Sequence, residues 1–440
     1  MFEKEEGKLE GLRKKYNDIP IPPNVDEYIL SGIRKEKRRR ATTRWKWGAI
    51  AASIFFIVML TSIRVSPTFA DYVSSIPGLQ KIVDIVRNDK GLVAAIENDY
   101  MQEINKSVEK NGITLTVDAI IMDEDVSLLF YTIVADQDYP SLFLNDPTLI
   151  SESGEDLQLG YSYSSHSEIK KNEPVTGILT IADYKHGSIP ESLQFRTNIK
   201  NDFSDVVEDL HVSFSYDKEK FAKIKKVYEV DQTITVEDQK IYVDRMEIRP
   251  TRIVVYVEYN NENKQEIFGF DDIQLVDGNG EVWTPTDGLV YDKLDENKIA
   301  LNFQSNYFAE PNELFLTFTS LRALPKEEIE VTIDLEKNKI VNAPKDGKLA
   351  FVDSSFWDVT FELMVDEQDY YHHRPLFHST FTDANGKEYS FNNSSGSSTE
   401  EGIHVKTLGG VNMNEVASPI TLTISDYPNR LRKDVRLQLK

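Results

Sequence analysis

The most apolar stretch of the chain is an uncharged run of 17 residues, Trp47–Ile63. As an α-helix this run extends roughly 26 Å, and Trp45 and a snorkelling Lys46 bring it close to the ~30 Å hydrocarbon core of a bilayer. A buried core helix is the alternative, but an all-round apolar run flanked by basic residues on one side favours a membrane anchor. The sequence therefore predicts a single transmembrane helix over residues 47–63.

Residues 64–110 follow with a helical pattern that is interrupted at Pro77-Gly78. Apolar residues recur at roughly helical spacing on both sides of a second break at Gly91, namely Leu79, Ile82, Val83, Ile85 and Val86, then Leu92, Val93, Ile96, Tyr100 and Ile104. We predict a short membrane-proximal helical segment over this range.

From Ile113 onward the apolar period changes to two. Apolar residues alternate with polar ones over 113–119 and again from Val126, and the acidic turn Asp123-Glu124-Asp125 lies between the two runs. Strict alternation around a turn is typical of a half-buried β-hairpin, so the rest of the chain is predicted to be mainly β.

The β region repeats itself. Val117–Ile120 leads into Leu128–Phe130 in the same way as Val243–Met246 leads into Val254–Tyr256, at an offset of 126 residues. Two further pairs of short segments also match: Ile189–Phe195 matches Glu310–Phe315, and Leu179–Tyr184 matches Leu422–Tyr427. Asp277-Gly278-Asn279-Gly280 and Asp383-Ala384-Asn385-Gly386 resemble fragments of a calcium loop but lack the remaining oxygen ligands, so hairpin turns are the better interpretation.

Modules of about 110 residues with short alternating strands indicate tandem antiparallel immunoglobulin-like β-sandwiches after the single transmembrane helix and the short helical segment. The predicted domains are a cytoplasmic head with a basic collar at 1–46, a transmembrane helix at 47–63, a membrane-proximal helical segment at 64–110, β-sandwich modules at 111–220 and 229–343, and a C-terminal β module at 344–440.

Charge predicts the orientation of the anchor. Residues 1–46 carry 13 Lys/Arg and 8 Asp/Glu, a net of +5, whereas the whole chain is −23. A basic collar before the apolar run places the N-terminus in the cytoplasm, where anionic lipid headgroups can bind the collar, and it places the acidic bulk outside the cell membrane. We expect no direct nucleic-acid binding. A secretory cleavage site at Thr68-Phe69-Ala70 is disfavoured, because the 44 residues before Trp45 are too long for the n-region of an ordinary signal peptide.

Two apolar stripes in the head have no core to join. Short helical patterns place Leu9 and Leu12 on one face, and Val25, Ile29 and Ile33 on another, with Asn24 as a possible cap. A partly disordered tether explains these residues as well as a docking segment does. Under the second interpretation these five residues bind a cytoplasmic partner.

Composition argues against an enzyme. The chain has no cysteine, which excludes disulfides, thiolate nucleophiles and cysteine-based zinc sites. No nucleophile elbow, phosphate-binding glycine loop or zinc-protease helix is present. His372, His373 and His378 lie near acidic residues, but neighbouring strand residues point to opposite faces, so a solvated loop is the simpler explanation. We predict no catalytic residues, no metal and no cofactor.

Four short motifs carry a resemblance to known proteins: Pro67-Thr68-Phe69-Ala70, Ile76-Pro77-Gly78-Leu79, Asp89-Lys90-Gly91-Leu92 and Asn111-Gly112-Ile113-Thr114. With them, roughly residues 20–140 resemble Gram-positive single-pass membrane proteins described as negative effectors of extracytoplasmic-function sigma factors. The resemblance implies an anti-sigma-like head that binds a cytoplasmic sigma factor, and an outer β-rich sensor region with an unknown ligand or partner. The His-x-x-x-Cys-x-x-Cys element of zinc-containing anti-sigma domains is absent from residues 1–46.

Two function hypotheses from different classes follow. In the first, the protein is a transmembrane regulator that couples the outer β modules to a sigma factor. In the second, it is an anchored envelope adhesion or scaffold protein whose β modules are binding surfaces. A sigma-factor gene immediately upstream would favour the first.

Overall fold

A computed structural model describes residues 79–163, 168–183, 189–200, 206–222, 225–286, 291–365, 375–398 and 403–440. All of them lie in one compact unit, Ile76–Lys440. The predicted transmembrane helix lies outside the described residues. Within the described ranges, no helix has the length and apolar character needed to span a bilayer.

Two short helices open the described chain, α4 (Leu79–Val86) and α5 (Lys90–Glu97). The Asp89 side chain caps α5 by accepting a hydrogen bond from the backbone N–H of Leu92 at 3.0 Å. Helix α5 ends at Asn98, and Asp99 adopts a left-handed φ of 57° that turns the chain. The described part of the predicted helical segment, from Leu79, is therefore made of two helices as far as Glu97. The helix prediction is wrong for the last part of the segment, including Ile104, because residues from Gln102 form a strand.

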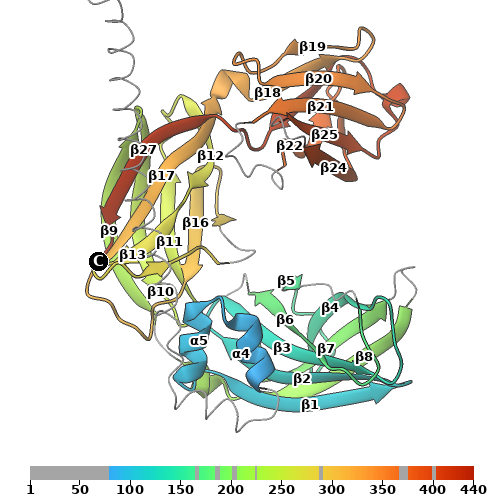
Figure 1. Cartoon of the computed structure of the whole chain (residues 1–440), viewed down its shortest axis with the longest axis vertical. Helices are drawn as coiled ribbons and strands as arrows, with labels where there is room; N and C mark the ends of the chain where they lie inside the picture. The colour runs from blue at the N-terminus through green and yellow to red at the C-terminus, as the bar shows by residue number, and fades with distance from the viewer. Residues whose placement is uncertain are drawn as a thin grey trace, which may run out of the picture. The chain divides into compact units, whose positions relative to one another are not determined.

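The first β module consists of two antiparallel sheets (Figure 1). One sheet has the order β1-β2-β3-β6-β5 and the other has the order β4-β7-β8. Tyr131 and Phe195, one from each sheet, are fully buried with ring centroids 6.4 Å apart, so the two sheets share a core. The strands are β1 (Gln102–Lys110), β2 (Ile113–Met122), β3 (Val126–Ala135), β4 (Phe143–Ser151), β5 (Gly160–Tyr163), β6 (Val175–Ala182), β7 (Ser192–Lys200) and β8 (Val206–Ser215).

The second β module repeats the order of the first, as β9-β10-β11-β16-β15 in one sheet. Its second sheet contains β12, β17, β13 and β14, and β27 pairs with β17. Both sheets supply side chains to one hydrophobic core that includes Val255, Leu316 and Phe318. The strands are β9 (Lys226–Val236), β10 (Gln239–Ile248), β11 (Arg252–Tyr259), β12 (Gln265–Asp271), β13 (Gln274–Asp277), β14 (Val282–Trp283), β15 (Tyr291–Lys293), β16 (Lys298–Gln304), β17 (Leu314–Pro325) and β27 (Arg430–Gln438).

The predicted duplication agrees with these strands in detail. Strand β10 has the bounds of β2 shifted by 126 residues, and both hairpins break register at the equivalent valines, Val117 and Val243. The second matched pair, Ile189–Phe195 and Glu310–Phe315, runs into strands β7 and β17, and each of these strands has a paired strand on both sides. The third predicted match, between Leu179–Tyr184 and Leu422–Tyr427, is wrong, because the two segments lie in strands at different positions. Leu422–Ile424 lies in β26, between β18 and β22, whereas Leu179 lies in β6, between β3 and β5.

The third β module is inserted into the second one. Its sheets have the orders β19-β18-β26-β22-β23 and β20-β21-β25-β24, and it lies between β17 and β27, which pair with each other. The predicted boundary at residues 343 and 344 is therefore wrong. The strands are β18 (Glu330–Asp334), β19 (Lys339–Asn342), β20 (Leu349–Ser354), β21 (Asp358–Met364), β22 (Phe377–Thr382), β23 (Glu388–Ser390), β24 (Asn393–Ser398), β25 (Ile403–Gly409) and β26 (Ile420–Ile424); short 3₁₀ turns occupy Lys218–Phe221, Lys326–Glu328 and Met413–Glu415.

The two calcium-like segments are turns. In one, the Asp277 carboxylate accepts from the backbone N–H groups of Asn279 and Glu281 at 2.9 and 2.8 Å. In the other, the Asp383 carboxylate accepts from Asn385 and Lys387 at 2.8 and 3.0 Å. Each aspartate thus closes its own hairpin, between β13 and β14 or between β22 and β23, as the sequence predicts.

Asp118 is a poorly hydrated carboxyl on β2. It accepts a hydrogen bond from the Thr132 hydroxyl at 2.7 Å, and Thr132 lies 2.9 Å from the Thr176 hydroxyl on the next strand. Burial raises the pKa of Asp118 to about 6, although the Thr132 hydrogen bond and the charge of Lys81 act in the opposite direction. Because the folded-state pKa lies above the usual value of 3.8 for an aspartate, folding favours the protonated acid.

We expect the stability contribution of Asp118 to be fully present below pH ~4 and to be lost as the pH rises through about 6. The pKa shift of Asp118 corresponds to an unfavourable free energy of ~3 kcal/mol at most when the carboxyl is ionised in the folded chain. Water reaches part of the carboxyl and reduces this cost. Asp118→Asn, which has no charge at that position, should therefore stabilise the first module by about 1–2 kcal/mol at pH 7. Calorimetry of the wild-type and variant chains from pH 4 to 7 measures the difference. The two transitions should converge near pH 4; a constant difference across this range would contradict the assignment.

Candidate functional site

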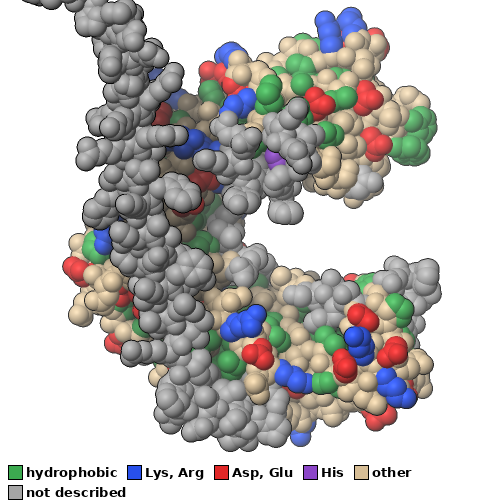
Figure 2. Space-filling model, viewed as in Figure 1, with side chains coloured by type: hydrophobic (Ala, Val, Ile, Leu, Met, Phe, Trp, Pro, Cys, Tyr) green, Lys and Arg blue, Asp and Glu red, His purple; other side chains and the backbone are tan. Residues whose placement is uncertain are grey.

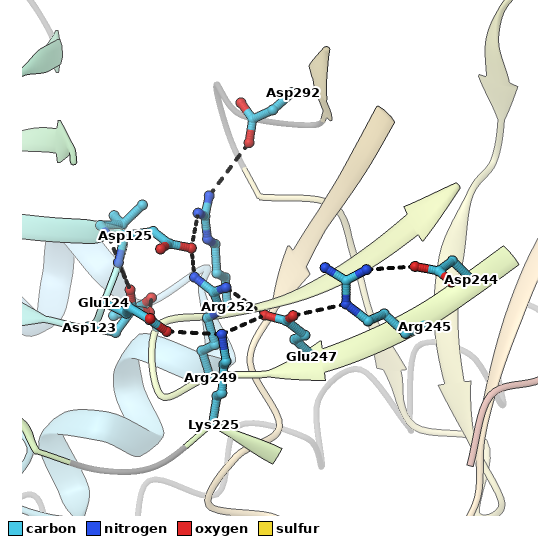
Figure 3. Close-up of polar contacts among 12 residues, drawn as sticks. Asp123, Glu124, Asp125, Lys225, Asp244, Arg245, Glu247, Arg249, Arg252 and Asp292 are labelled. Atoms are coloured by element: carbon cyan, nitrogen blue, oxygen red, sulfur yellow. Dashed lines mark hydrogen bonds and ion pairs between the residues drawn. The ribbon is translucent and has the colours of Figure 1, made fainter. Parts of the chain in front are cut away.

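The first two β modules meet through equivalent hairpins. The β2–β3 turn, Asp123–Asp125, lies against the β10–β11 turn, Arg249–Thr251, which is the same position shifted by 126 residues (Figure 3). The Asp125 carboxylate forms an ion pair with the Arg249 guanidinium. The Thr251 hydroxyl donates a hydrogen bond to the Asp123 carboxylate, and Arg252 Nη2 donates to Asp125 Oδ2 at 3.4 Å.

Two further charges extend this contact. Arg249 Nη2 donates to Glu247 Oε2 at 2.5 Å, and Lys225 Nζ lies 3.1 Å from Glu124 and 3.5 Å from Glu247 (Figure 3). Burial lowers the pKa of Lys225, but the hydrogen bonds and negative charges of Glu124 and Glu247 outweigh it and raise the pKa above its usual value. We call the whole set the clamp: Asp123, Glu124, Asp125, Lys225, Glu247, Arg249, Thr251 and Arg252.

The centre of the clamp is buried. The side chains of Arg249 and Glu247 are 4% and 5% exposed, and those of Asp125 and Arg252 are 11% and 12% exposed. Buried charges are tolerated when each has a partner, and removal of one partner leaves an uncompensated charge that is costly, by about 3–5 kcal/mol. Any arrangement of the two hairpins that separates these charges is therefore costly, whereas the intact clamp adds little net stability to the fold.

Helices α4 and α5 dock beside the clamp. Lys90 Nζ, at the start of α5, lies 3.1 Å from Glu281 Oε1 and donates to the Val282 carbonyl at 3.2 Å. A Cβ on Gly91 would lie 2.5 Å from the backbone nitrogen of Ser305, closer than real Cβ atoms approach. The segment Asp89-Lys90-Gly91-Leu92 thus caps α5, pairs with the second module and allows the helix to contact its backbone.

Further contacts of Asn88 and Tyr100 join the helical segment and the residues after it to the modules. The Gln304 side chain at the end of β16 donates to the Asn88 carbonyl at 2.8 Å. The Tyr100 hydroxyl is within hydrogen-bonding distance of the carbonyls of Met122, at 3.0 Å, and Phe221, at 3.1 Å. The Tyr100 ring packs 5.8 Å from that of Phe308 in the second module. The helical segment therefore contacts both modules.

A cleft of about 420 Å³ opens at the same junction. Its apolar lining includes Val86, Leu92, Leu128 and Ile178, and its polar lining includes Arg252 and Gln304. The size lies within the range of small-molecule sites. Any ligand bound in this cleft would contact the helices and both modules at once.

The sequence interpretation found only part of this site. The predicted partner-binding residues Leu9, Leu12, Val25, Ile29 and Ile33 lie outside the described residues, as do His372 and His373. His378 lies on β22. Within the described ranges, no three histidine or acidic side chains are placed to share a metal ion. The clamp was missed, although the change from Asp123 to Arg249 at equivalent repeat positions was visible in the sequence.

Two family models match parts of the chain. A domain of unknown function, DUF4179, matches residues 40–135, and a family of unknown function, DUF5643, matches residues 225–341. The first match ends at the last residue of β3, and the second begins at Lys225. The acidic turn Asp123–Asp125 and the helices fall in the first match, and the other clamp residues, including Glu247 and the arginines, fall in the second.

No curated protein matches the chain. A crystal structure of a conserved domain protein from Bacillus anthracis is similar to 55% of this chain and 84% of that chain, at 14% identity and a TM-score of 0.35. A likeness at this level carries no argument about function.

Arg249→Ala should leave Glu247 and Asp125 as buried charges without their principal partner. We expect a loss of about 3 kcal/mol in unfolding free energy, because buried pairs are costly to break. Arg245→Ala is the matched control: Arg245 also contacts Glu247, at 3.1 Å, but its side chain is 34% exposed, so a loss below ~1 kcal/mol is expected. Thermal unfolding of the full chain compares them, and equal losses would contradict the role given to burial.

Gly91→Ala should weaken helix docking, although alanine is the better helix former by about 1 kcal/mol. The added Cβ would displace α5 from the Ser305 backbone, and we expect a net destabilisation of about 1–3 kcal/mol from overpacking. Hydrogen–deuterium exchange of α5 and residues 304–306 should become faster. Lys90→Ala is the control, because it removes the exposed contacts with Glu281 and the Val282 carbonyl and adds no atom next to the Ser305 backbone. Slower exchange in Gly91→Ala would show that the close contact does not constrain the helix.

Proposed function

We propose that the protein is a membrane-anchored regulator, an anti-sigma-like negative effector, whose N-terminal head is cytoplasmic and whose β modules lie outside the cell membrane. In this proposal the head binds a sigma factor, and the modules respond to an extracytoplasmic ligand or partner. We classify the modules as immunoglobulin-like β-sandwiches, because each consists of antiparallel sheets packed around a shared core.

The observation that carries the proposal is the docking of α4 and α5 at the junction of the first two modules. These helices are separated from the end of the predicted membrane span by 15 residues, and they and the turn between them contact Gln304, Ser305 and Glu281 of the second module. A ligand that changes the junction would therefore change the position or order of the chain next to the membrane. That coupling is what a transmembrane sensor requires.

Three sequence features support the rest of the proposal. The basic collar favours a cytoplasmic head, the apolar stripes of the head lack an internal core, and residues 20–140 resemble negative effectors of sigma factors. The two matched families have no described function, so the proposal rests on topology and on these features.

The envelope scaffold remains the second candidate because one surface of the third module favours it. Phe356 and Trp357 are 47% and 53% exposed at the β20–β21 turn, with ring centroids 4.8 Å apart. The carbonyls of Trp357 and Phe356 accept hydrogen bonds from Gly410 and Met413 at 3.1 and 2.9 Å, which braces the turn. Exposed, braced aromatics are typical of binding surfaces.

The test of the regulatory proposal is the double variant Ile29→Asp with Ile33→Asp. If these residues fill a groove on the sigma factor, each loses on the order of 1.5–3 kcal/mol of apolar burial, and the partner is released. A pull-down of the neighbouring sigma factor with the full chain, and expression from its target promoter, should show lost capture and raised transcription. Ser31→Asp adds one negative charge off the stripe and is the charge-matched control for the single variant Ile29→Asp.

Two outcomes would count against the regulator. If the double variant still captures the sigma factor and keeps the promoter silent, the stripe is not the interface. If the wild-type chain captures no sigma factor and deletion of the gene leaves the promoter unchanged, the scaffold becomes the better account. Protease added to intact protoplasts tests the orientation separately, because it should remove the β modules and spare the head.

A further inference from the structure

The cleft of about 420 Å³ at the junction of the helices and the first two modules has the composition of a small-molecule site. Pockets that bind small molecules combine a mostly apolar lining with a few polar groups that fix the orientation of the ligand. Here Arg252 and Gln304 are among the polar groups. The apolar lining comes from α4, α5, β3 and β6, namely Ile85, Val86, Leu92, Val126, Leu128 and Ile178.

Two large hydrophobic side chains remain exposed at this cleft. Ile85 of α4 and Tyr163 of β5 are 37% and 38% exposed, and both line it. Single exposed hydrophobic residues are normal on a protein surface, and on the face of the first module that Figure 2 shows, hydrophobic side chains form only small patches between charged ones. At the cleft, by contrast, hydrophobic side chains from two elements border the same cavity. A ligand bound there would cover both.

The charges at the cleft are balanced. Among the described residues that line it, Asp89 and Arg252 are the only charged side chains, so their charges sum to zero. The Asp89 carboxylate accepts a hydrogen bond from the backbone N–H of Leu92 at 3.0 Å. Arg252 lies near the carboxylates of Asp125 and Asp292. A charged group of a ligand would lose its hydration in the cleft without meeting a counter-charge that the protein does not already use, so the cleft favours an uncharged ligand.

Arg252 has hydrogen-bonding capacity left for such a ligand (Figure 3). Its Nη2 donates to Asp125 Oδ2 at 3.4 Å, and its Nη1 lies 3.8 Å from Asp292 Oδ2, which are both long contacts for a charged pair. Its Nε is buried and has no hydrogen-bond partner in the part of the chain that the structure describes. A guanidinium has five N–H donors, and a buried donor that lacks an acceptor is costly. An oxygen atom of a ligand in the cleft would supply the acceptor.

We propose that this cleft binds an uncharged amphipathic small molecule, whose aliphatic part lies against the apolar lining and whose carbonyl or other oxygen accepts a hydrogen bond from Arg252. Such a ligand contacts α4, α5 and both modules, so its binding stabilises the docked helices. The inference rests on the proposed function in one respect, because this ligand would be the extracytoplasmic signal. Its binding is measured without a sigma factor.

The test uses the full chain in lipid nanodiscs and a probe, octanamide with a diazirine at the end of its chain. On illumination the probe forms covalent adducts with neighbouring side chains, and peptide mass spectrometry locates them, which separates the cleft from probe dissolved in the lipid. We expect adducts on the cleft residues of α4, β3 and β6. Unlabelled octanamide should prevent them at a concentration at least tenfold lower than octanoate or octylammonium, which carry a negative or a positive charge on a chain of the same length.

Ile178→Trp adds a large side chain to the cleft lining and should reduce adduct formation at least tenfold. Val175→Trp is the matched control, because Val175 lies on the same strand but does not line the cleft, and it should leave adduct formation unchanged. Unchanged hydrogen exchange in β7 and β8 checks that both variants fold.

Arg252→Lys keeps a positive charge beside Asp125 but lacks the Nε donor and the planar guanidinium. It should raise the concentration of octanamide that gives half-protection at least fivefold. In the wild-type chain, bound octanamide should slow hydrogen exchange in α4 and α5.

Adducts that lie only outside the cleft, or cleft adducts that octanamide does not prevent, would overturn the proposal. Equal or better protection by octanoate or octylammonium would show that the cleft does not select an uncharged group and would overturn it too, as would full adduct formation in Ile178→Trp. These outcomes are separate from those of the regulatory proposal. Octanamide binding by a chain that captures no sigma factor would support the cleft and remove only the regulator, whereas capture without octanamide binding would remove only the cleft.

Discussion

The contact on which the arrangement of the first two modules depends is the buried ion group of Asp125, Arg249 and Glu247. It forms because a duplicated hairpin meets its own equivalent with the opposite charge. Two identical acidic turns would repel each other at this distance. The substitution of an arginine for Asp123 at the equivalent position converts that repulsion into an ion pair, and burial makes it specific. The helices dock next to this contact, because Gln304 is the last residue of β16, where it pairs with Arg252 of the clamp, and Ser305 follows it.

The third module is attached by a similar device. Arg322 on β17 lies 2.6 Å from Asp271 and 2.9 Å from Asp426, while Arg430 on β27 lies 2.6 Å from Asp271. Gly269 leaves the space that the Arg322 guanidinium occupies. In a chain with no cysteine, both junctions are therefore held by buried arginines and carboxylates. Such contacts are screened by salt less than surface pairs are, which suits a protein whose overall charge is strongly negative.

The sequence predicted the local structure well where one face of a strand or helix is buried. The alternation at 113–130 located the β2–β3 hairpin, and the offset of 126 located its copy to the residue. Strand β1 was mistaken for helix because it is an edge strand with only partly buried apolar residues, so Tyr100 and Ile104 matched a helical period by chance. The match at Leu422 failed for a similar reason: buried strands of unrelated position share the same short alternation.

Contacts between residues far apart in the sequence could not be predicted from the local pattern of apolar and polar residues. Nothing near Arg430 indicates that β27 pairs with a strand that ended more than a hundred residues earlier, and this pairing decides where the third module begins. The clamp residues have the composition of solvent-exposed turns, so only the comparison of repeat positions could have drawn attention to them. Gly91 looked like a helix break, whereas its role is to let α5 contact the Ser305 backbone.

The insertion of the third module between two paired strands has a mechanical consequence. A tensile load applied to that module enters the second module through β17 and β27 together, at the end where Arg322 pairs with Arg430. Both strands are then drawn in the same direction along their own length, so the load acts in parallel on the ladder bonds that β17 forms with β12 and β13. Two strands of the second module therefore share any load on the third, and neither can be extracted without shearing the sheet.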